Sequence, residues 1–186
     1  MPARMSDLLS GEADVVARAQ RGDHGAFAAI YGQYQARIAG YLYRMVQDAE
    51  VAADLTQDVF VSAYRAIGQT KPGLNVKAWL FAIATNAALS HHRRRRLLQW
   101  LPLDQSSDGL AGDSVEEGVT SRAELTAALS ALPRDQAACF LLWAREGFTY
   151  EEIGKMLDIA PGTAKTRSYR ARLALSRFLR AYEEGT

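Results

Sequence analysis

The chain has 186 residues, of which 48% are hydrophobic and 23% charged, so it holds one domain or two small ones. No apolar run approaches the roughly 18 residues that span a bilayer, and no signal-peptide core is present, so we expect a cytoplasmic protein. The formal net charge of +1 conceals a segregation of charge. Residues 1–96 carry twelve basic and eight acidic side chains. Residues 97–121 carry no basic and five acidic side chains, and residues 122–186 carry ten basic and eight acidic ones.

Four helices are predicted in the first of these regions. Residues 11–21 form a short helix, and residues 24–47 form a long amphipathic helix whose aromatic side chains are expected in the core. Residues 48–67 repeat the helical pattern, and the Gly and Pro within residues 68–75 break it. A fourth helix runs from about residue 76 to residue 96. The short connections favour antiparallel neighbours in a helical bundle.

The third helix has a polar side that is separate from its inward stripe around Leu55. Such a side is often only solvated, so composition alone does not assign it a function. The residues that share this side are Asp54, Gln57, Asp58 and Val61.

The fourth helix ends in a run of four arginines, Arg93 to Arg96. Adjacent guanidinium groups repel one another unless an anion lies near, which favours contact with phosphate. The alternative is a solvated helix end that interacts with the helix dipole. His91 and His92 precede the run, but adjacent helical positions point about 100° apart. With no other His or Cys nearby, we predict no metal and no cofactor.

Helical periodicity is absent from residues 97–120, where Gly, Pro, Ser and Asp gather, and this stretch is predicted to be a flexible acidic linker. Order resumes with a capping box formed by Ser121 and Glu124. Pro133 starts the next helix, on which the single cysteine, Cys139, occupies an apolar position. We expect this cysteine to be a buried hydrophobic side chain rather than a reactive thiol.

A helix-turn-helix follows. Thr149 and Glu152 form a capping box at the start of a short helix, and Gly154 leaves room for a second helix to approach. Asp158 can adopt the left-handed turn conformation, and Pro161 restarts a helix with its φ already set. Residues 162–182 contain six basic side chains and no acid. A solvated basic face is the alternative, but the combination favours a helix that enters the major groove of DNA.

The predicted fold is therefore all-α, with two small helical domains at residues 1–96 and 121–186 joined by the linker. No Ser/His/Asp set, phosphate-binding loop or paired carboxylate in an apolar setting is present, so we predict that the protein is not an enzyme.

Three segments resemble bacterial RNA polymerase sigma factors of the extracytoplasmic-function group. Residues 48–66, with Asp54 before Leu-Thr-Gln-Asp-Val-Phe, resemble the region that binds core polymerase. Residues 78–88 with the arginine run are similar to the promoter-melting region, and residues 132–172 resemble the upstream-element-binding domain. The three motifs occur in the order and spacing of the family and together cover nearly all of residues 11–180.

The resemblance implies a factor that turns core polymerase into a promoter-specific holoenzyme, with promoter DNA and an anti-sigma protein as further partners. It implies docking on the large subunits of the polymerase through Asp54, Gln57, Asp58 and Phe60. In the minus-ten element, the loop at residues 69–76 and Asn86 would hold a flipped base, above a scaffold packed by Trp79. The acidic linker would thread the RNA exit path.

The DNA-binding residues implied in this way form two sets. The minus-ten set comprises Asn75, Asn86, Ser90, Arg93, Arg94, Arg95 and Arg96. In the minus-thirty-five element, base contacts would come from Lys165, Thr166, Tyr169 and Arg170, and backbone contacts from Thr163, Arg167 and Arg172.

The chain departs from the family pattern at Ala160, Asp158 and Ala164, which replace a capping Ser, a turn Gly and a larger apolar residue. These three positions lie in the turn and at the start of the recognition helix, where they affect its angle. The main alternative function is a helix-turn-helix regulator that is not a polymerase subunit. It would need a ligand or phospho-acceptor domain, for which no strand pattern exists. A nucleic-acid-modifying enzyme would need clustered carboxylates, which are also absent.

Overall fold

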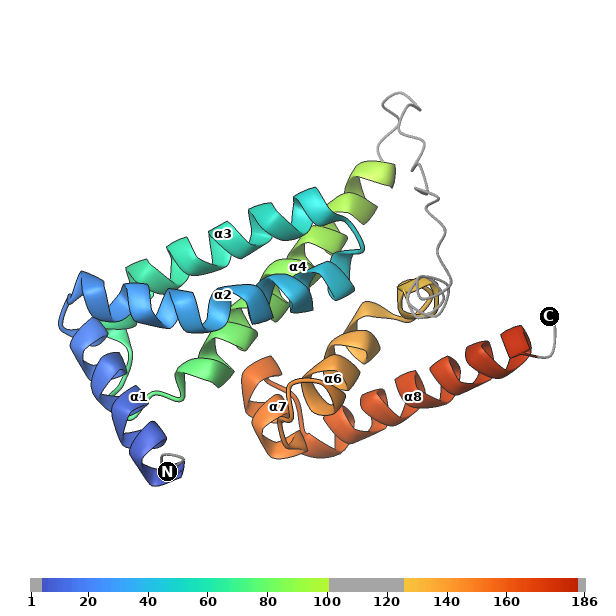
Figure 1. The fold of residues 1–186 in the computed structure, drawn as a ribbon. Coiled ribbons are helices and arrows are strands. Elements are labelled where there is room, and N and C mark those ends of the chain that lie inside the picture. Colours follow the sequence, from blue (N-terminus) through green and yellow to red (C-terminus); the bar gives the residue numbers. More distant parts are fainter. Residues whose placement is uncertain (1–4, 101–125, 184–186) are drawn as a thin grey trace.

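The computed structural model describes residues 5–100 and 126–183, and these form two helical domains with no strand in either described range (Figure 1). The all-α prediction is confirmed. None of the described helices is both long and apolar enough to cross a membrane. The N-terminal domain consists of α1 (Met5–Gln20), α2 (His24–Val46), α3 (Ala49–Ala66), the 3-10 helix η1 (Ile67–Gln69) and α4 (Val76–Trp100).

The core of the N-terminal domain lies between α2, α3 and α4, which pack against one another. Ile38, Leu42 and Leu80 are fully buried, as amphipathic helices around one core require. Two buried polar groups satisfy each other, because the Tyr41 hydroxyl lies 2.8 Å from Thr85 Oγ1. The two hydroxyl groups are therefore buried in the core as a hydrogen-bonded pair.

The C-terminal domain consists of a helical stretch at residues 126–130 and three further helices. Its core is built around the pairing of α6 and α8, with α7 packed on both. Ala138, Cys139, Leu142 and Ile153 are fully buried there. The helices are α6 (Arg134–Ala144), α7 (Tyr150–Leu157) and α8 (Pro161–Glu183).

Two predicted boundaries were wrong. The first helix begins at Met5 rather than residue 11. The fourth helix continues to Trp100 rather than ending at Arg96, because no helix breaker occurs before Pro102. The remainder of the predicted linker and the capping box at residues 121–124 lie outside the described residues.

The two domains are in contact, since α7 and α6 pack on α4 and α6 also touches α2 (Figure 1). Phe81 of α4 meets Phe148 of the turn before α7 edge to face, with ring centroids 5.5 Å apart. The Lys77 ammonium lies 4.3 Å from the centroid of the Phe148 ring. Aromatic and cation–π contacts of this kind are favourable in a partly desolvated interface.

Candidate docking face and nucleic-acid interface

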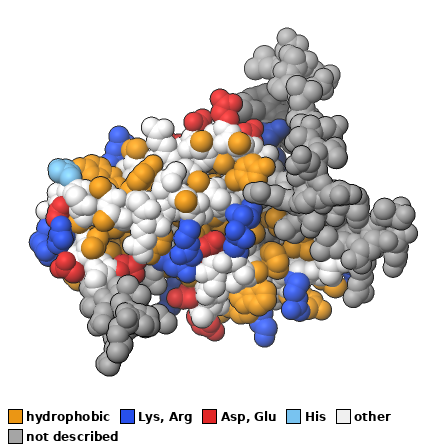
Figure 2. Space-filling model, in the orientation of Figure 1, with side chains coloured by type: hydrophobic (Ala, Val, Ile, Leu, Met, Phe, Trp, Pro, Cys, Tyr) orange, Lys and Arg blue, Asp and Glu red, His pale blue; other side chains and the backbone are white. Residues whose placement is uncertain are grey.

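The polar side of α3 is exposed, as predicted. Asp54, Gln57, Asp58 and Val61 all lie at the surface, whereas Val59 on the opposite side of the helix is buried. Figure 2 shows acidic side chains gathered along the edge of the molecule that α3 forms, with hydrophobic side chains beside them. Asp48 caps the start of α3, because its Oδ1 accepts a hydrogen bond from the Val51 N–H over 3.0 Å.

A groove of about 820 Å³ lies between α3 and α2, next to this polar side. Phe60, which the resemblance places on the docking face, is only 4% exposed. Its ring packs edge to face on Tyr31, with centroids 4.8 Å apart, so it lines the groove and does not project from the surface. The other lining residues include Phe27, Gln57, Val61 and Tyr64.

The sequence analysis missed two aromatic residues of this groove. Tyr31 was expected in the core but is 45% exposed, and Tyr64 is 47% exposed. Tyr31 occupies the side of α2 that faces α3, and α3 covers it only partly. The Tyr64 hydroxyl lies 2.7 Å from His24 Nδ1, which ties the end of α3 to the start of α2. The apolar and aromatic side chains of residues 24–47 occupy a wider face than one neighbouring helix can cover. That width could have indicated that some of them are exposed.

On α4, three of the predicted minus-ten residues, Asn86, Ser90 and Arg93, lie at helical spacing on one face. Asn86 is exposed, and Ser90 Oγ accepts a hydrogen bond of 3.0 Å from Arg93 Nη2. The side chains of Arg94, Arg95 and Arg96 are also exposed. Asn86 and Arg93 are seven positions apart, which places them on the same face, about 10 Å apart along the helix.

Asn75 and Trp79 mark the start of α4. The Asn75 Oδ1 atom accepts a hydrogen bond of 3.0 Å from the Ala78 N–H, so this side chain caps the helix in the free protein. Trp79 is partly buried and packs against the hydrophobic core, in agreement with its predicted scaffold role.

His91 and His92 lie side by side on α4, with ring centroids 5.7 Å apart. No group of three potential metal-binding side chains occurs among the described residues. The Nε2 atom of His92 lies 2.9 Å from the Met45 carbonyl oxygen, which ties α4 to the end of α2. Burial lowers the pKa of His92, and the nearby positive charge of Arg134 lowers it further.

The helix-turn-helix is confirmed in detail. The Glu152 N–H donates to Thr149 Oγ1 over 3.2 Å, and the Thr149 N–H donates to the Glu152 carboxylate over 2.8 Å, which completes the capping box. Asp158 has a φ of 52° and ends α7 in the left-handed conformation. A Cβ atom at Gly154 would lie 2.7 Å from the Ile159 carbonyl oxygen, so only glycine fits this close approach of turn and helix.

The recognition helix α8 divides into an inner and an outer side. Ala164, Ser168 and Ala171 are buried against the domain. Arg167, predicted to contact the DNA backbone, is paired with Asp135 of α6 through an Nε–Oδ2 distance of 3.0 Å. The exposed predicted residues are Thr163, Lys165, Thr166, Tyr169, Arg170 and Arg172.

Cys139 is fully buried, as expected. Burial raises the pKa of its thiol to about 11. Only a small fraction of this thiol is therefore ionised at neutral pH, which agrees with a packing role.

Both domains match known families. Residues 30–97 match Sigma-70 region 2, and residues 122–175 match Sigma-70 region 4. The sequence is 33% identical to the RNA polymerase sigma-H factor of Pseudomonas aeruginosa, over 92% of this chain and 96% of that protein. It is 32% identical to the ECF RNA polymerase sigma factor SigE of Mycolicibacterium smegmatis, over 97% of this chain and 72% of that protein.

Solved structures agree with this assignment. The sigma factor RpoE from Bartonella quintana, in complex with the anti-sigma factor NepR, superposes with a TM-score of 0.70 and 27% identity, covering 83% of this chain and 96% of that one. CnrH in complex with the cytosolic domain of CnrY has a TM-score of 0.72 at 23% identity, covering 91% and 97%. Because region 2 accounts for the N-terminal bundle, a regulator unrelated to polymerase is not favoured. The chain belongs to the sigma-70 family of RNA polymerase sigma factors, in the extracytoplasmic-function group.

Proposed function

We propose that the chain docks on core RNA polymerase through the exposed side of α3 and the groove beside it. Eight large hydrophobic side chains are exposed among the described residues, and three of them, Tyr31, Val61 and Tyr64, line this groove. Exposed apolar side chains that gather at one place mark an interaction site. Asp54 and Asp58 are exposed on the same helix, α3, so the partner is a helical element with apolar anchors and flanking basic residues.

The second surface is the outer side of α8, which reads the minus-thirty-five element in the major groove. Its exposed Lys165, Thr166, Tyr169 and Arg170 supply the donors, acceptors and apolar contacts that base edges require. Arg167 is paired with Asp135 through Nε in the free protein, so a DNA phosphate would bind its Nη atoms or displace that carboxylate. Phosphate contacts of this kind position the helix but carry no sequence information.

The third surface lies on α4 and the loop before it, and it binds the melted minus-ten element. Asn86 and Arg93 share one face of the helix, so a base held by the Asn86 amide leaves its neighbouring phosphates within reach of the arginines. A flipped base exposes its hydrogen-bonding edge, and a side-chain amide offers both a donor and an acceptor to that edge.

We further propose control by an anti-sigma protein, because the structural neighbour RpoE of Bartonella quintana was solved in complex with the anti-sigma factor NepR. The α2–α3 groove is the surface for which that inhibitor and the polymerase would compete. In this scheme the protein acts in the cytoplasm, where the polymerase transcribes DNA. The chain contributes no bond-making chemistry of its own, because nucleotide addition belongs to the polymerase.

The observation that carries the proposal is the coincidence of an acidic exposed helix side with an apolar groove. A reconstituted assay tests it: purified bacterial core polymerase is incubated with the full chain and with promoter templates selected from a randomised pool. We expect specific initiation only when the chain is present. A chain that binds DNA alone and neither copurifies with core polymerase nor alters its start sites would contradict the proposal and favour an independent regulator.

A further inference from the structure

The side chain of Gln20, the last residue of α1, reaches across to the loop that precedes α4. Its Nε2 atom donates hydrogen bonds to Thr70 Oγ1 over 2.7 Å and to the Lys71 carbonyl oxygen over 3.0 Å. The Thr70 carbonyl oxygen lies at 3.5 Å from the same nitrogen. One amide group thus holds two successive residues of the loop, fifty positions further along the chain.

Thr70 in turn is hydrogen-bonded to η1. Its Oγ1 donates to the Ile67 carbonyl oxygen over 2.6 Å, and its backbone N–H donates to the same oxygen over 3.1 Å. The hydroxyl therefore accepts from Gln20 and donates to Ile67, so both of its hydrogen-bonding functions are used. A Cβ atom at Gly68 would lie 3.4 Å from the Gln20 carbonyl oxygen, which shows that α1 and η1 are in close contact.

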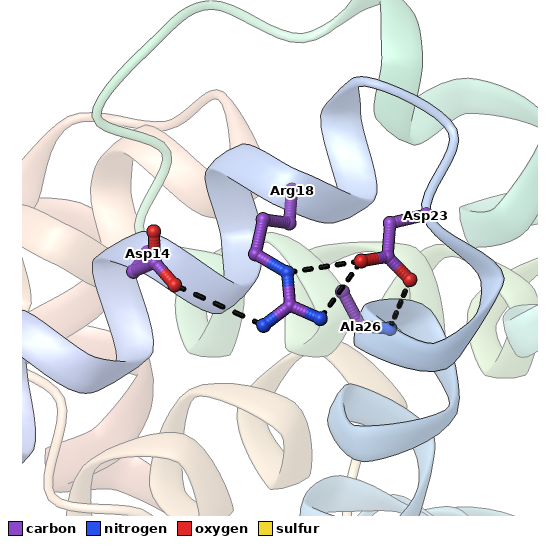
Figure 3. Close-up of polar contacts among 4 residues, drawn as sticks. All are labelled: Asp14, Arg18, Asp23 and Ala26. Carbon is purple, nitrogen blue, oxygen red and sulfur yellow. Dashed lines mark hydrogen bonds and ion pairs between the residues drawn. The ribbon is translucent and has the colours of Figure 1, made fainter.

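The position of Gln20 is itself fixed by an ion pair between α1 and the start of α2 (Figure 3). Arg18 donates to Asp23 Oδ2 from Nε over 2.9 Å and from Nη2 over 2.8 Å. Asp23 Oδ1 accepts from the Ala26 N–H over 3.0 Å, so one carboxylate both caps α2 and anchors the last turn of α1. Val16 and Ala19 are buried beneath that turn.

The far end of the loop is held independently. Asn75 caps α4, and Gly73 has a φ of +75°, a conformation that suits glycine. Residues 71–74 therefore span two anchored ends, and Gln20 supplies the anchor on the α1 side. This helix precedes the segment that matches Sigma-70 region 2, which starts at residue 30.

We propose that Gln20 is a positioning residue for promoter reading, because it holds the loop at residues 70–75 in the shape that receives the flipped minus-ten base. This inference rests on the function proposed for that loop. A loop that is ordered before binding does not lose its conformational freedom when the base enters, and its hydrogen-bonding groups discriminate between bases more strongly. Without the Gln20 amide, the same loop would have to order at the moment of binding.

The test compares Gln20→Ala with Gln33→Ala in the full chain. Gln33 of α2 is a matched control. Its Nε2 donates to Glu12 Oε1 of α1 over 3.4 Å, so it also links α1 to a neighbouring helix, but it does not touch the loop. Gln20→Glu is the second variant, since it keeps the side-chain size and loses both donors. Circular dichroism establishes that all three variants retain their helices.

Two measurements are made on each variant. Amide hydrogen exchange of residues 67–79 reports the order of the loop, and loss of two hydrogen bonds is expected to speed exchange at Thr70 about tenfold. Transcription by the reconstituted holoenzyme from templates randomised across the minus-ten and minus-thirty-five regions reports base discrimination. We expect both Gln20 variants to reduce discrimination at the flipped minus-ten base about tenfold and to leave minus-thirty-five selection unchanged, while Gln33→Ala behaves as the wild type.

Each other outcome overturns the inference in a distinguishable way. Unchanged loop exchange in the Gln20 variants means that the amide does not order the loop. Faster exchange with unchanged discrimination, while Asn86→Ala does alter minus-ten selection, removes the positioning role and leaves the proposed function intact. If neither the Gln20 variants nor Asn86→Ala changes minus-ten selection, the proposed role of this surface fails, and the inference fails with it.

Discussion

Arg37 of α2 and Glu146 of the turn before α7 form an ion pair across the two domains, with 2.7 Å between Nη2 and Oε2. The Glu146 side chain is only 6% exposed, whereas that of Arg37 is 46% exposed. The Glu146 carbonyl oxygen also accepts a hydrogen bond of 2.5 Å from Lys77 Nζ. Both the side chain and the backbone of one residue in the C-terminal domain are thus held by cations of the N-terminal domain. Burial lowers the pKa of Lys77, and the positive charge of Arg37 lowers it further.

Replacing Glu146 by Gln should weaken the contact between the domains. The ion pair is half exposed on the Arg37 side, so we expect a loss of about 1 kcal/mol and a larger effect at low salt. Small-angle X-ray scattering of the free protein should show a larger radius of gyration for Glu146→Gln. The exposed neighbour Arg145, changed to Gln, is the control, and an equal expansion in that variant would contradict the role of the ion pair.

Asp58→Arg should abolish assembly with core polymerase, because it reverses a charge on the exposed side of α3 next to the apolar groove. The helical content should not change, since Asp58 is exposed and α3 keeps its cap. Competition for core polymerase against the labelled wild type measures the effect. Glu151→Arg makes the same change of charge at an exposed position of α7 and should compete normally. Normal competition by Asp58→Arg would show that the docking face lies elsewhere.

Alanine at Lys165 or Arg170 should weaken recognition of the upstream element by about 1–3 kcal/mol if the side chain contacts a base edge. Both side chains are exposed on α8 and neither caps a helix, so core binding should remain unchanged. Binding of the holoenzyme to matched and scrambled upstream sequences separates the two kinds of contact. Equal losses on both sequences would mean that these side chains touch only phosphate.

Asn86→Ala should leave closed promoter binding nearly intact and reduce strand opening on duplex DNA. The exposed amide is expected to hold an extruded base, and its loss removes part of the energy that offsets unpairing. A template already mismatched across the start region should restore much of the activity. Permanganate footprinting of unpaired thymines measures opening on both templates. Unchanged reactivity of the duplex template with the variant would refute the role of Asn86.

Gly154→Ala should destabilise the C-terminal domain by about 1–3 kcal/mol, because the added methyl would lie 2.7 Å from the Ile159 carbonyl oxygen and force the turn to move. Gly162→Ala is the matched control. It lies in the first turn of α8, and an added methyl would have no neighbour within 4 Å. That substitution should be neutral or slightly stabilising. Chemical denaturation of both variants decides the point, and equal stabilities would show that the turn adapts without cost.

The helix-turn-helix could be predicted almost residue by residue, because its signals act within a few positions. A cap at Thr149, a left-handed turn at Asp158 and a helix start at Pro161 each follow from local chemistry. The exposure of Tyr31 was wrongly predicted, since it depends on how far α3 covers α2. Phe60 was named as a docking residue only through the resemblance, and its burial beside the α2–α3 groove depends on how the two helices pack.

The sequence by itself determined the helical class, the acidic side of α3 and the basic outer side of α8, since helical periodicity and charge are properties of neighbouring positions. Only the tertiary structure paired Arg37 with Glu146, 109 positions apart, and Gln20 with Thr70, 50 positions apart. Such pairs depend on how whole helices cross and on which side-chain atoms then meet. A hydrogen bond forms only within a few tenths of an ångström of its ideal length, and no local pattern encodes a distance between remote segments to that accuracy.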